Sequence, residues 1–310
     1  MFFNGSKKFR SFLLFLVSII IAVPASLRAC ACGCGIFDVG TSAMLPTHPG
    51  GMAFLEYDFM DQDQNWSGTS KASPDDNSDK RIKTHFMTAG AQYMFNRRWG
   101  MKAEVPFWNR NFITTYDDGN IAKFNHSALG DVRIQGIFSG FSPDMSTGLT
   151  FGLKLPTGDD KFRHFDRDTS IGTGSTNILL GAFHVGQFAA KNWNWFANSE
   201  LDQSVLITPD YRPGTELNAV TGAYYNGWKV GNVKMAPLGQ VLGSIRWSDT
   251  GNDSNHPDSG YKRVFLSPGL EFDAAGWRIY ADVAFPIYTN VNGNQLVASE
   301  LYKLNMSRAF

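Results

Sequence analysis

Three cysteines stand together near the N-terminus as Cys30-Ala31-Cys32-Gly33-Cys34, and they are the only cysteines in the 310 residues. Alternating thiolates could clamp a soft metal ion such as Cu(I) or Zn(II). Leu27-Arg28-Ala29-Cys30 also has the shape of a lipoprotein cleavage site, which would place a lipid on Cys30. The third alternative is an unmodified thiol-bearing tail with a Cys32–Cys34 or an intermolecular disulfide. The spacing alone leaves these three chemistries open.

Histidine chemistry is weakly indicated. The six histidines are scattered, without a His-x-x-x-His pair: His48, His85, His126, His164, His184 and His256. His126-Ser127 is the only adjacent pair of a histidine and a serine, and nucleophilic catalysis also needs a third group to orient the imidazole. His164 lies in the charged segment 161–168, which we expect to be a solvated loop. We therefore expect no enzyme and no cofactor apart from a soft metal at the cysteines.

Charged residues of both signs recur at alternate positions beside apolar ones. They are Lys102, Glu104, Asp131, Arg133, Lys154, Glu200, Asp202, Arg263, Glu271, Asp273, Arg278 and Asp282. Side chains at alternate positions of a strand share one face, so these residues would line one side of a sheet. Because both signs occur, we expect ion pairs inside a polar lumen rather than a strongly ion-selective pore.

The elements that carry these charges have a period of two. In Trp277-Arg278-Ile279-Tyr280-Ala281-Asp282-Val283, apolar residues occupy every odd position and the two charges face the other way. Each such strand has one apolar and one polar face, a pattern that soluble antiparallel sheets share with membrane barrels. Periodicity therefore predicts an all-β protein without choosing between these architectures.

Connection lengths favour a barrel. We predict strands near 51–60, 81–94, 100–113, 128–140, 146–156, 176–187, 193–204, 215–226, 231–246, 261–273, 276–288 and 295–310. Long polar linkers alternate with short turns: they are 61–80, 114–127, 157–175, 205–214 and 247–260. Only the last connection at the long-linker end, near 290–294, is short. Long loops at one end are typical of outer-membrane barrels. We predict an antiparallel transmembrane β-barrel of about 12 strands, with 10 or 14 as alternatives.

Composition and the N-terminus fix the compartment. The chain has 28 basic and 28 acidic side chains, which argues against a nucleic-acid partner. A basic start followed by the apolar run 12–25 is the plan of a secretory signal peptide. We predict a signal peptide at 1–29, a Cys-rich periplasmic segment at 30–50 and the barrel at 51–310. Residues 36–50 could plug the lumen.

Aromatic residues support a membrane location. Seven tryptophans lie mostly near predicted strand ends, where amphipathic rings meet the membrane surface: Trp99, Trp108, Trp193, Trp195, Trp228, Trp247 and Trp277. The chain ends in Phe310 on an alternating strand, which resembles the assembly signal read by the barrel-assembly machinery, although Arg308 interrupts the apolar face. We therefore expect membrane lipid and lipopolysaccharide as surroundings of a Gram-negative outer-membrane protein, with its N-terminus in the periplasm.

Three patches carry a resemblance to a known family. Ala128-Leu129-Gly130-Asp131-Val132, Gly152-Leu153-Lys154-Leu155-Pro156-Thr157-Gly158-Asp159 and Gly172-Thr173-Gly174-Ser175 occur in this order. The set resembles the outer-membrane transporters named for the MetA pathway of phenol degradation. The resemblance implies a barrel that carries small organic molecules. From the residues themselves, we expect Pro156 to end a strand and Gly158 to permit a sharp turn.

Two functions follow from these patterns. The first is a channel or transporter for small solutes, organic or aromatic ones among them. The alternative is a non-conducting barrel that anchors a metal-binding or partner-binding segment at Cys30, Cys32 and Cys34.

Overall fold

The computed structural model describes residues 45–46, 48–116, 118–208 and 210–310. Two short 3-10 helices, η3 (Pro74–Asp76) and η4 (His256–Asp258), interrupt an otherwise all-β structure in this part of the chain. The strands are β1 (Gly50–Gly68), β2 (Ser70–Lys71), β3 (Asp79–Met94), β4 (Trp99–Thr115), β5 (Ile121–Leu129), β6 (Arg133–Phe138), β7 (Thr147–Lys154), β8 (Thr176–Gln187), β9 (Trp193–Leu206), β10 (Glu216–Tyr225), β11 (Trp228–Val230), β12 (Val233–Arg246), β13 (Tyr261–Ala274) and β14 (Trp277–Ala309).

The strands form one closed antiparallel barrel. Its order is β10-β9-β8-β7-β6-β4-β3-β1-β14-β13-β12, and β12 pairs again with β10. A ring of eleven elements cannot close with antiparallel neighbours throughout unless one element reverses direction. That element is β14, whose residues up to Val291 pair with β13 and whose residues from Val291 onward pair with β1. Gly293, with φ of 54°, lies at the reversal. The wall therefore has twelve passes, as predicted.

The two faces of the wall differ in chemistry. On β7, Leu149, Phe151 and Leu153 are each 43% exposed on the outer surface. Side chains of the opposite face are buried and often charged, such as Asp58 on β1 and Arg110 on β4. An apolar outside and a polar inside are the pattern of a barrel that sits in lipid. Among the described residues, no helix is long and apolar enough to cross a membrane.

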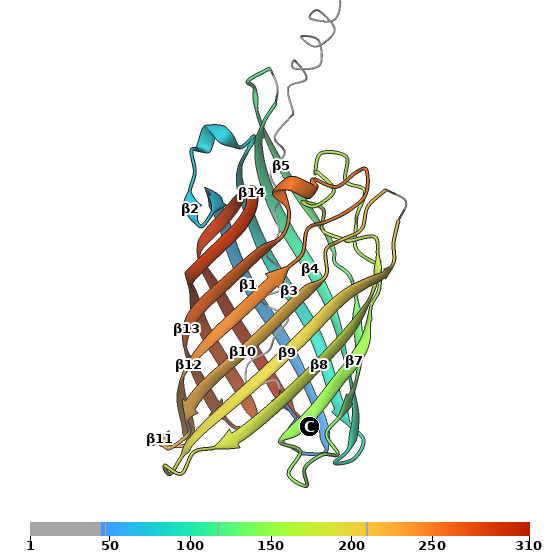
Figure 1. Ribbon diagram of the computed structural model, residues 1–310. Coiled ribbons are helices and arrows are strands. Elements are labelled where there is room, and N and C mark those ends of the chain that lie inside the picture. Colours follow the sequence, from blue (N-terminus) through green and yellow to red (C-terminus); the bar gives the residue numbers. More distant parts are fainter. Residues whose placement is uncertain (1–44, 47, 117, 209) are drawn as a thin grey trace, which may run out of the picture.

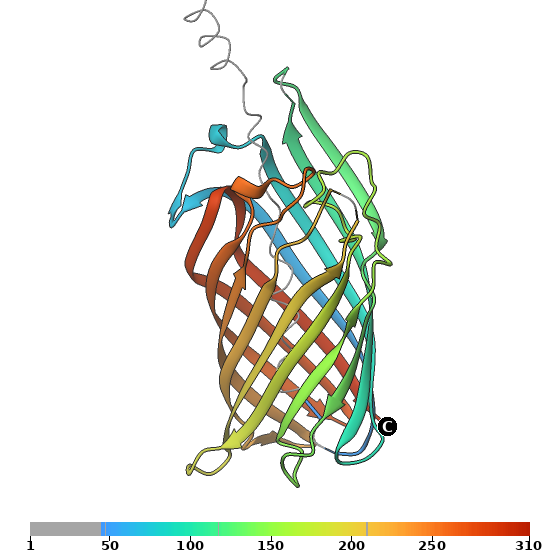
Figure 2. The same ribbon diagram turned by 45° about the vertical axis from the view of Figure 1, so that its right-hand side comes forward.

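The two ends of the barrel also differ. Short turns and the C-terminus lie at one end, here called the turn end, and long connections lie at the other, the loop end (Figures 1 and 2). Two predicted linkers are wrong in part, because β1 runs on to Gly68 within 61–80 and β4 and β5 form a hairpin across 114–127. Outside lipid both faces of a strand meet water, so the apolar alternation that marks a membrane strand is absent there.

The predicted strand 128–140 is broken in two. Residues of β4 from Phe107 onward pair with β5, and its residues from Trp99 to Glu104 pair with β6. Pro106 lies between these two sets, and its carbonyl accepts a hydrogen bond from the Gly130 amide (2.9 Å). In a hydrogen-bonded antiparallel pair, each residue donates its backbone N–H to the carbonyl of the other, but Pro106 has no N–H to donate to Gly130. The wall therefore breaks beside Pro106.

Aromatic rings gather at the turn end. Trp99 packs on Phe138 (centroids 4.7 Å apart), and Trp193 packs on Tyr225 (5.4 Å). Arg308 does not disrupt this belt, because its guanidinium carbon lies 5.1 Å from the centroid of the Trp277 ring. The prediction for Trp108 is wrong, since this residue lies on the inner face and lines a cavity.

The chain ends are joined at the turn end. The backbone of Phe310 exchanges two hydrogen bonds with that of Gly51, each 2.9 Å long, which completes the pairing of β14 with β1. Leu45 is buried in the same apolar cluster as the inward side chains Met60 and Met94. Residues 45–46 therefore lie within the mouth, while the rest of the predicted plug before residue 45 falls outside the described residues.

Candidate functional site

The break beside Pro106 is repaired by a side chain from another segment. The Gly130 carbonyl, which lacks its usual partner on Pro106, accepts a hydrogen bond from the Thr157 hydroxyl (3.0 Å). The same hydroxyl oxygen accepts a hydrogen bond from the Val132 amide (2.9 Å). Thr157 thus bridges β5 and β6, and it holds the chain that follows β7 next to the break. Pro156 follows the end of β7 at Lys154, in agreement with its predicted role.

Asp131 joins the three sequence patches into a structure that we call the Asp131 knot (Asp131, Gly158, Gly172 and Thr173). One carboxylate oxygen of Asp131 accepts from the Gly158 amide (3.0 Å). The other oxygen accepts from the amide (2.9 Å) and the hydroxyl (2.6 Å) of Thr173. Hydrogen bonds to a carboxylate are roughly twice as strong as neutral ones. The knot therefore fixes both ends of the segment between β7 and β8.

The glycines of the knot are required by a close contact between two backbones. A Cβ on Gly158 would lie 2.6 Å from the Gly172 Cα, and a Cβ on Gly172 would lie 2.3 Å from the Gly158 carbonyl carbon. Only backbones without side chains can approach so closely. The chain bends at Gly158, as predicted, and the close contact is a further requirement for glycine there. Gly174, with φ of 63°, occupies a left-handed conformation.

Between its fixed ends, the segment 155–175, here called the inner loop, folds against the inner wall. The Phe162 ring stacks on His126 of β5, with centroids 3.9 Å apart and planes at 5°. His126 Nε2 also lies 2.8 Å from a carboxylate oxygen of Asp159. Arg110 of β4, 1% exposed, donates to the carbonyls of Thr169 and Ser170, the second at 3.3 Å. The inner loop is thus attached to both strands of the β4–β5 hairpin.

Two carboxyl groups of the inner loop have opposite pKa shifts. The Lys161 amide donates a hydrogen bond to Asp159, and this bond together with His126 lowers the pKa of Asp159 below its ordinary value. Burial raises the pKa of Asp168 well above its ordinary value, and the carboxylates of Asp166, Asp249 and Asp79 add to this. The inner loop therefore holds one stabilised carboxylate and one carboxyl group that favours its protonated form.

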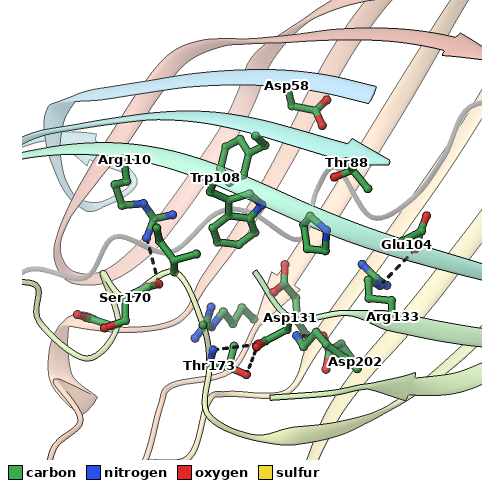
Figure 3. A pocket seen from close by; sticks show the side chains of 18 of the residues that line it. Asp58, Thr88, Glu104, Trp108, Arg110, Asp131, Arg133, Ser170, Thr173 and Asp202 are labelled. Carbon is green, nitrogen blue, oxygen red and sulfur yellow. Dashed lines mark hydrogen bonds and ion pairs between the residues drawn. The ribbon is translucent and has the colours of Figure 1, made fainter. Parts of the chain in front are cut away.

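A cavity of about 150 Å³ lies inside the barrel, next to the inner loop. Its apolar side is made by Phe86, Pro106, Trp108 and Ile171, with Phe86 and Trp108 in an edge-to-face contact (centroids 4.8 Å apart, planes at 80°). Figure 3 shows Trp108 beside Arg110, with Arg133 and Glu104 deeper along the cavity and Asp131 turned toward Thr173. The cavity therefore combines an aromatic side with a charged one.

The charged side of the cavity is ion-paired. Arg133 contacts Glu200 directly and Glu104 at 3.6 Å, and Gln135 donates to Glu200 (2.6 Å). Strands β6 and β9 are separated by β7 and β8, so the Arg133–Glu200 contact lies on the inner side of the wall. Further pairs are Lys154 with Asp202, Lys102 with Glu104 (3.0 Å) and Lys303 with Glu56 (2.9 Å) and Asp58 (3.6 Å).

The remaining charges named from the sequence make further contacts of their own. Arg278 contacts Glu271 (3.2 Å) and Asp273 (3.8 Å) in a separate cavity. Asp282 is bonded to Tyr280 and to Gln240 (3.2 Å). The guanidinium carbon of Arg263 lies 4.2 Å from the centroid of the Tyr261 ring.

Sequence reasoning missed several charged residues on the inner face, among them Glu56, Asp58, Arg110 and Lys303. The alternation in Leu55-Glu56-Tyr57-Asp58-Phe59 could have revealed the first two. Lys303 has a similar signal between Tyr302 and Leu304. Arg110 has none, because Asn109 and Asn111 flank it with polar side chains.

The side chains of His126 and Ser127 do not meet at one site. His126 faces the inner loop, whereas the Ser127 hydroxyl accepts a bond from Asn109 (2.7 Å) on the outer face. These two side chains cannot act on one substrate. No group of three or more metal-binding side chains occurs among the described residues. The three cysteines, and with them the predicted lipidation and soft-metal sites, lie outside those residues.

Comparison with known proteins gives the fold and no family. No family model and no curated protein matches the sequence. The structure is similar to an outer-membrane channel of the COG4313 group from Pseudomonas putida F1, with a TM-score of 0.63 and 12% identity over 86% of this chain and 97% of that one. It is also similar to the β domain of the Bordetella autotransporter BrkA, with a TM-score of 0.50 and 11% identity over 84% and 100%. This chain therefore has the fold of an outer-membrane β-barrel.

Proposed function

We propose that the protein is a passive outer-membrane channel for small organic solutes, including those with one aromatic ring. The cavity beside Trp108 carries this proposal, because it places an aromatic surface opposite ion-paired charges inside a closed barrel. The similarity in fold to a COG4313 outer-membrane channel supports it. The sequence resemblance to the phenol-degradation transporters points to the same class of solute.

The size of the cavity limits the solute. An apolar cavity of about 150 Å³ in another protein binds benzene, and the cavity here has the same volume, about 150 Å³. Its edge-to-face pair, Phe86 and Trp108, offers a ring face to a planar solute. Because Arg133 and Lys154 are paired with carboxylates, the net field on a passing solute is small. These features favour neutral, amphiphilic molecules.

We infer that the turn end faces the periplasm and the loop end faces the outside. This orientation follows the general plan of outer-membrane barrels, in which short turns are periplasmic and long loops external. It would place the N-terminus in the periplasm, membrane lipid and lipopolysaccharide around the apolar wall, and Phe310 where the barrel-assembly machinery could read it.

Single-channel recording in planar lipid bilayers tests this function. Benzamide serves as a ring-bearing neutral probe and propionamide as a probe without a ring. The wild type should carry a potassium chloride current that benzamide interrupts and propionamide does not. Trp108→Ala should weaken the benzamide block by roughly three- to tenfold, the value of one aromatic contact. Trp247→Ala is the matched control, because Trp247 is 54% exposed and does not line this cavity.

Absence of current would overturn the channel. If the barrel is sealed and the Cys30, Cys32 and Cys34 segment binds Cu(I) or Zn(II) stoichiometrically, the anchoring alternative replaces it. A current with equal block in wild type and Trp108→Ala would keep the channel but remove the cavity as its solute site.

A further inference from the structure

The inner loop closes one side of the cavity. Its residues Arg167, Asp168, Ser170, Ile171, Gly172 and Thr173 all line the cavity wall. Ile171 is 2% exposed, so its side chain is packed within the barrel rather than in solvent. The inner loop therefore forms part of the wall along which a solute would move between the cavity and the loop end.

The two ends of the inner loop and its middle are held by different kinds of contact. At the ends, the Asp131 carboxylate binds Gly158 and Thr173, and the backbones of Gly158 and Gly172 touch. These ends cannot separate without breaking a charged hydrogen-bond cluster and a close backbone contact. They therefore act as fixed points for the stretch 159–172 between them.

The middle is held by polar contacts and by the packing of Phe165 in an apolar cluster with residues of the wall. Arg110 donates to the Thr169 and Ser170 carbonyls, and its Nε donates to the Thr84 hydroxyl (3.0 Å). Asp159 contacts His126 at 2.8 Å, and Phe162 covers the same ring. These groups are buried while the loop is in place, with Arg110 1% and Thr169 0% exposed. When the loop moves they enter the polar lumen, where water can replace the guanidinium-to-carbonyl bonds. The middle can thus detach while the ends stay in place.

We propose that residues 159–172 form a gate on the loop-end side of the cavity and that Arg110 is the latch that holds this gate closed. The proposal rests on the channel function proposed above. Arg110 acts as a positioning residue, because its hydrogen bonds hold the gate. Its guanidinium carbon also lies over the Trp108 ring, 5.4 Å from the ring centroid. Opening would move Thr169 and Ser170 away from β4 and connect the cavity with the loop end.

Single-channel recording of Arg110→Met tests the latch. Methionine keeps an unbranched side chain in the buried position but has no donor for the two carbonyls. The open probability of Arg110→Met should rise at least tenfold, because the variant loses both charged hydrogen bonds to the gate. Arg97→Met is the matched control, because Arg97 also donates to a carbonyl, that of Pro143 (3.2 Å), but at the turn end. Its open probability should equal that of the wild type.

A reversible lock tests the gate without changing Arg110. In a background with Cys30→Ser, Cys32→Ser and Cys34→Ser, His126→Cys and Phe162→Cys place two thiols where the rings now stack 3.9 Å apart. Cadmium ions should bridge the two thiols and hold the gate closed, and a chelator should restore the current. The same lock should cancel the rise in open probability caused by Arg110→Met.

The outcomes separate the two proposals. If the wild type conducts but Arg110→Met matches Arg97→Met and cadmium has no effect on the double-cysteine variant, the gate is refuted and the channel stands. If no variant conducts, the channel itself is refuted, and the gate with it. If Arg110→Met does not fold, the response to cadmium alone decides for or against the gate.

Discussion

Asparagine in place of Asp131 should loosen both ends of the inner loop at once. The carboxylate accepts three hydrogen bonds, from the Gly158 amide (3.0 Å) and from the amide (2.9 Å) and hydroxyl (2.6 Å) of Thr173. The side chain introduced by Asp131→Asn would have the same shape but one acceptor oxygen instead of two, and its NH2 group would face an N–H donor. If its oxygen keeps the Thr173 donors, the Gly158 amide loses its partner.

The expected change in the free energy of opening the knot follows from these three hydrogen bonds. A donor left unsatisfied away from water costs about 1–3 kcal/mol, and two bonds that change from charged to neutral lose roughly another 1–2 kcal/mol together. A total of about 3 kcal/mol corresponds to a factor of roughly 100 in the opening equilibrium of the knot. Amide hydrogen exchange at Gly158 and Thr173 reports this equilibrium directly.

Exchange measured by mass spectrometry on the barrel in lipid nanodiscs provides the assay. Peptides that cover 157–175 should exchange about 100 times faster in Asp131→Asn than in the wild type. Asp144→Asn is the matched control, since Asp144 accepts the Ser146 amide (3.2 Å) in an exposed turn. Unchanged exchange at 157–175 would refute the role of Asp131. Faster exchange across β12 and β13 as well would show a general loss of stability instead of a local knot.

Three further predictions concern the same region. Thr157→Val keeps the shape of the side chain but removes the bridge between the Gly130 carbonyl and the Val132 amide. Amide hydrogen exchange at Val132 should therefore accelerate roughly tenfold or more. Thr157→Ser keeps the hydroxyl and should behave as the wild type. Gly172→Ala should disrupt the knot because its Cβ would lie 2.3 Å from the backbone of Gly158, while Gly243→Ala, with no neighbour within 4 Å, should leave the thermal unfolding midpoint unchanged. Burial raises the pKa of Asp168 in the folded state above the ordinary value of 3.8. Above pH 3.8 the unfolded chain releases the Asp168 proton while the folded protein still holds it. The free energy of unfolding therefore falls as the pH rises from 3.8 toward the pKa of the folded state. Asp168→Asn should remove that pH dependence in thermal unfolding monitored from pH 4 to 8, and an unchanged slope would contradict it.

The barrel could be predicted because lipid imposes a simple rule on the wall. Every membrane pass must show apolar side chains outward, so Leu149, Phe151 and Leu153 alternate with small or polar residues. Beyond the lipid the rule disappears. Asn109 and Asn125 pair their amides on the outer face of β4 and β5 (2.7 Å), which is compatible with a strand but invisible to a search for apolar alternation.

Contacts inside the lumen could be predicted less well. The alternation places Arg133 and Glu200 on inner faces, but which inner residues meet depends on how the strands are staggered around the barrel. Gly158 illustrates a second limit. Its motif suggests a turn, and the structure shows that it also touches Gly172. A glycine that is needed for contact and one that is needed for its φ angle look the same in a sequence.

Pro106 connects the fold to the proposed function. A proline within a sheet sacrifices a ladder bond and is normally confined to edges or bulges. Here the missing N–H leaves the Gly130 carbonyl free for Thr157, and Thr157 brings the chain after β7 to the break. Asp131, the next residue after Gly130, then binds both ends of that chain and directs it into the barrel. A continuous ladder at this position would seal the wall and leave the inner loop without its anchor. The break in the sheet is therefore what builds the cavity beside Trp108.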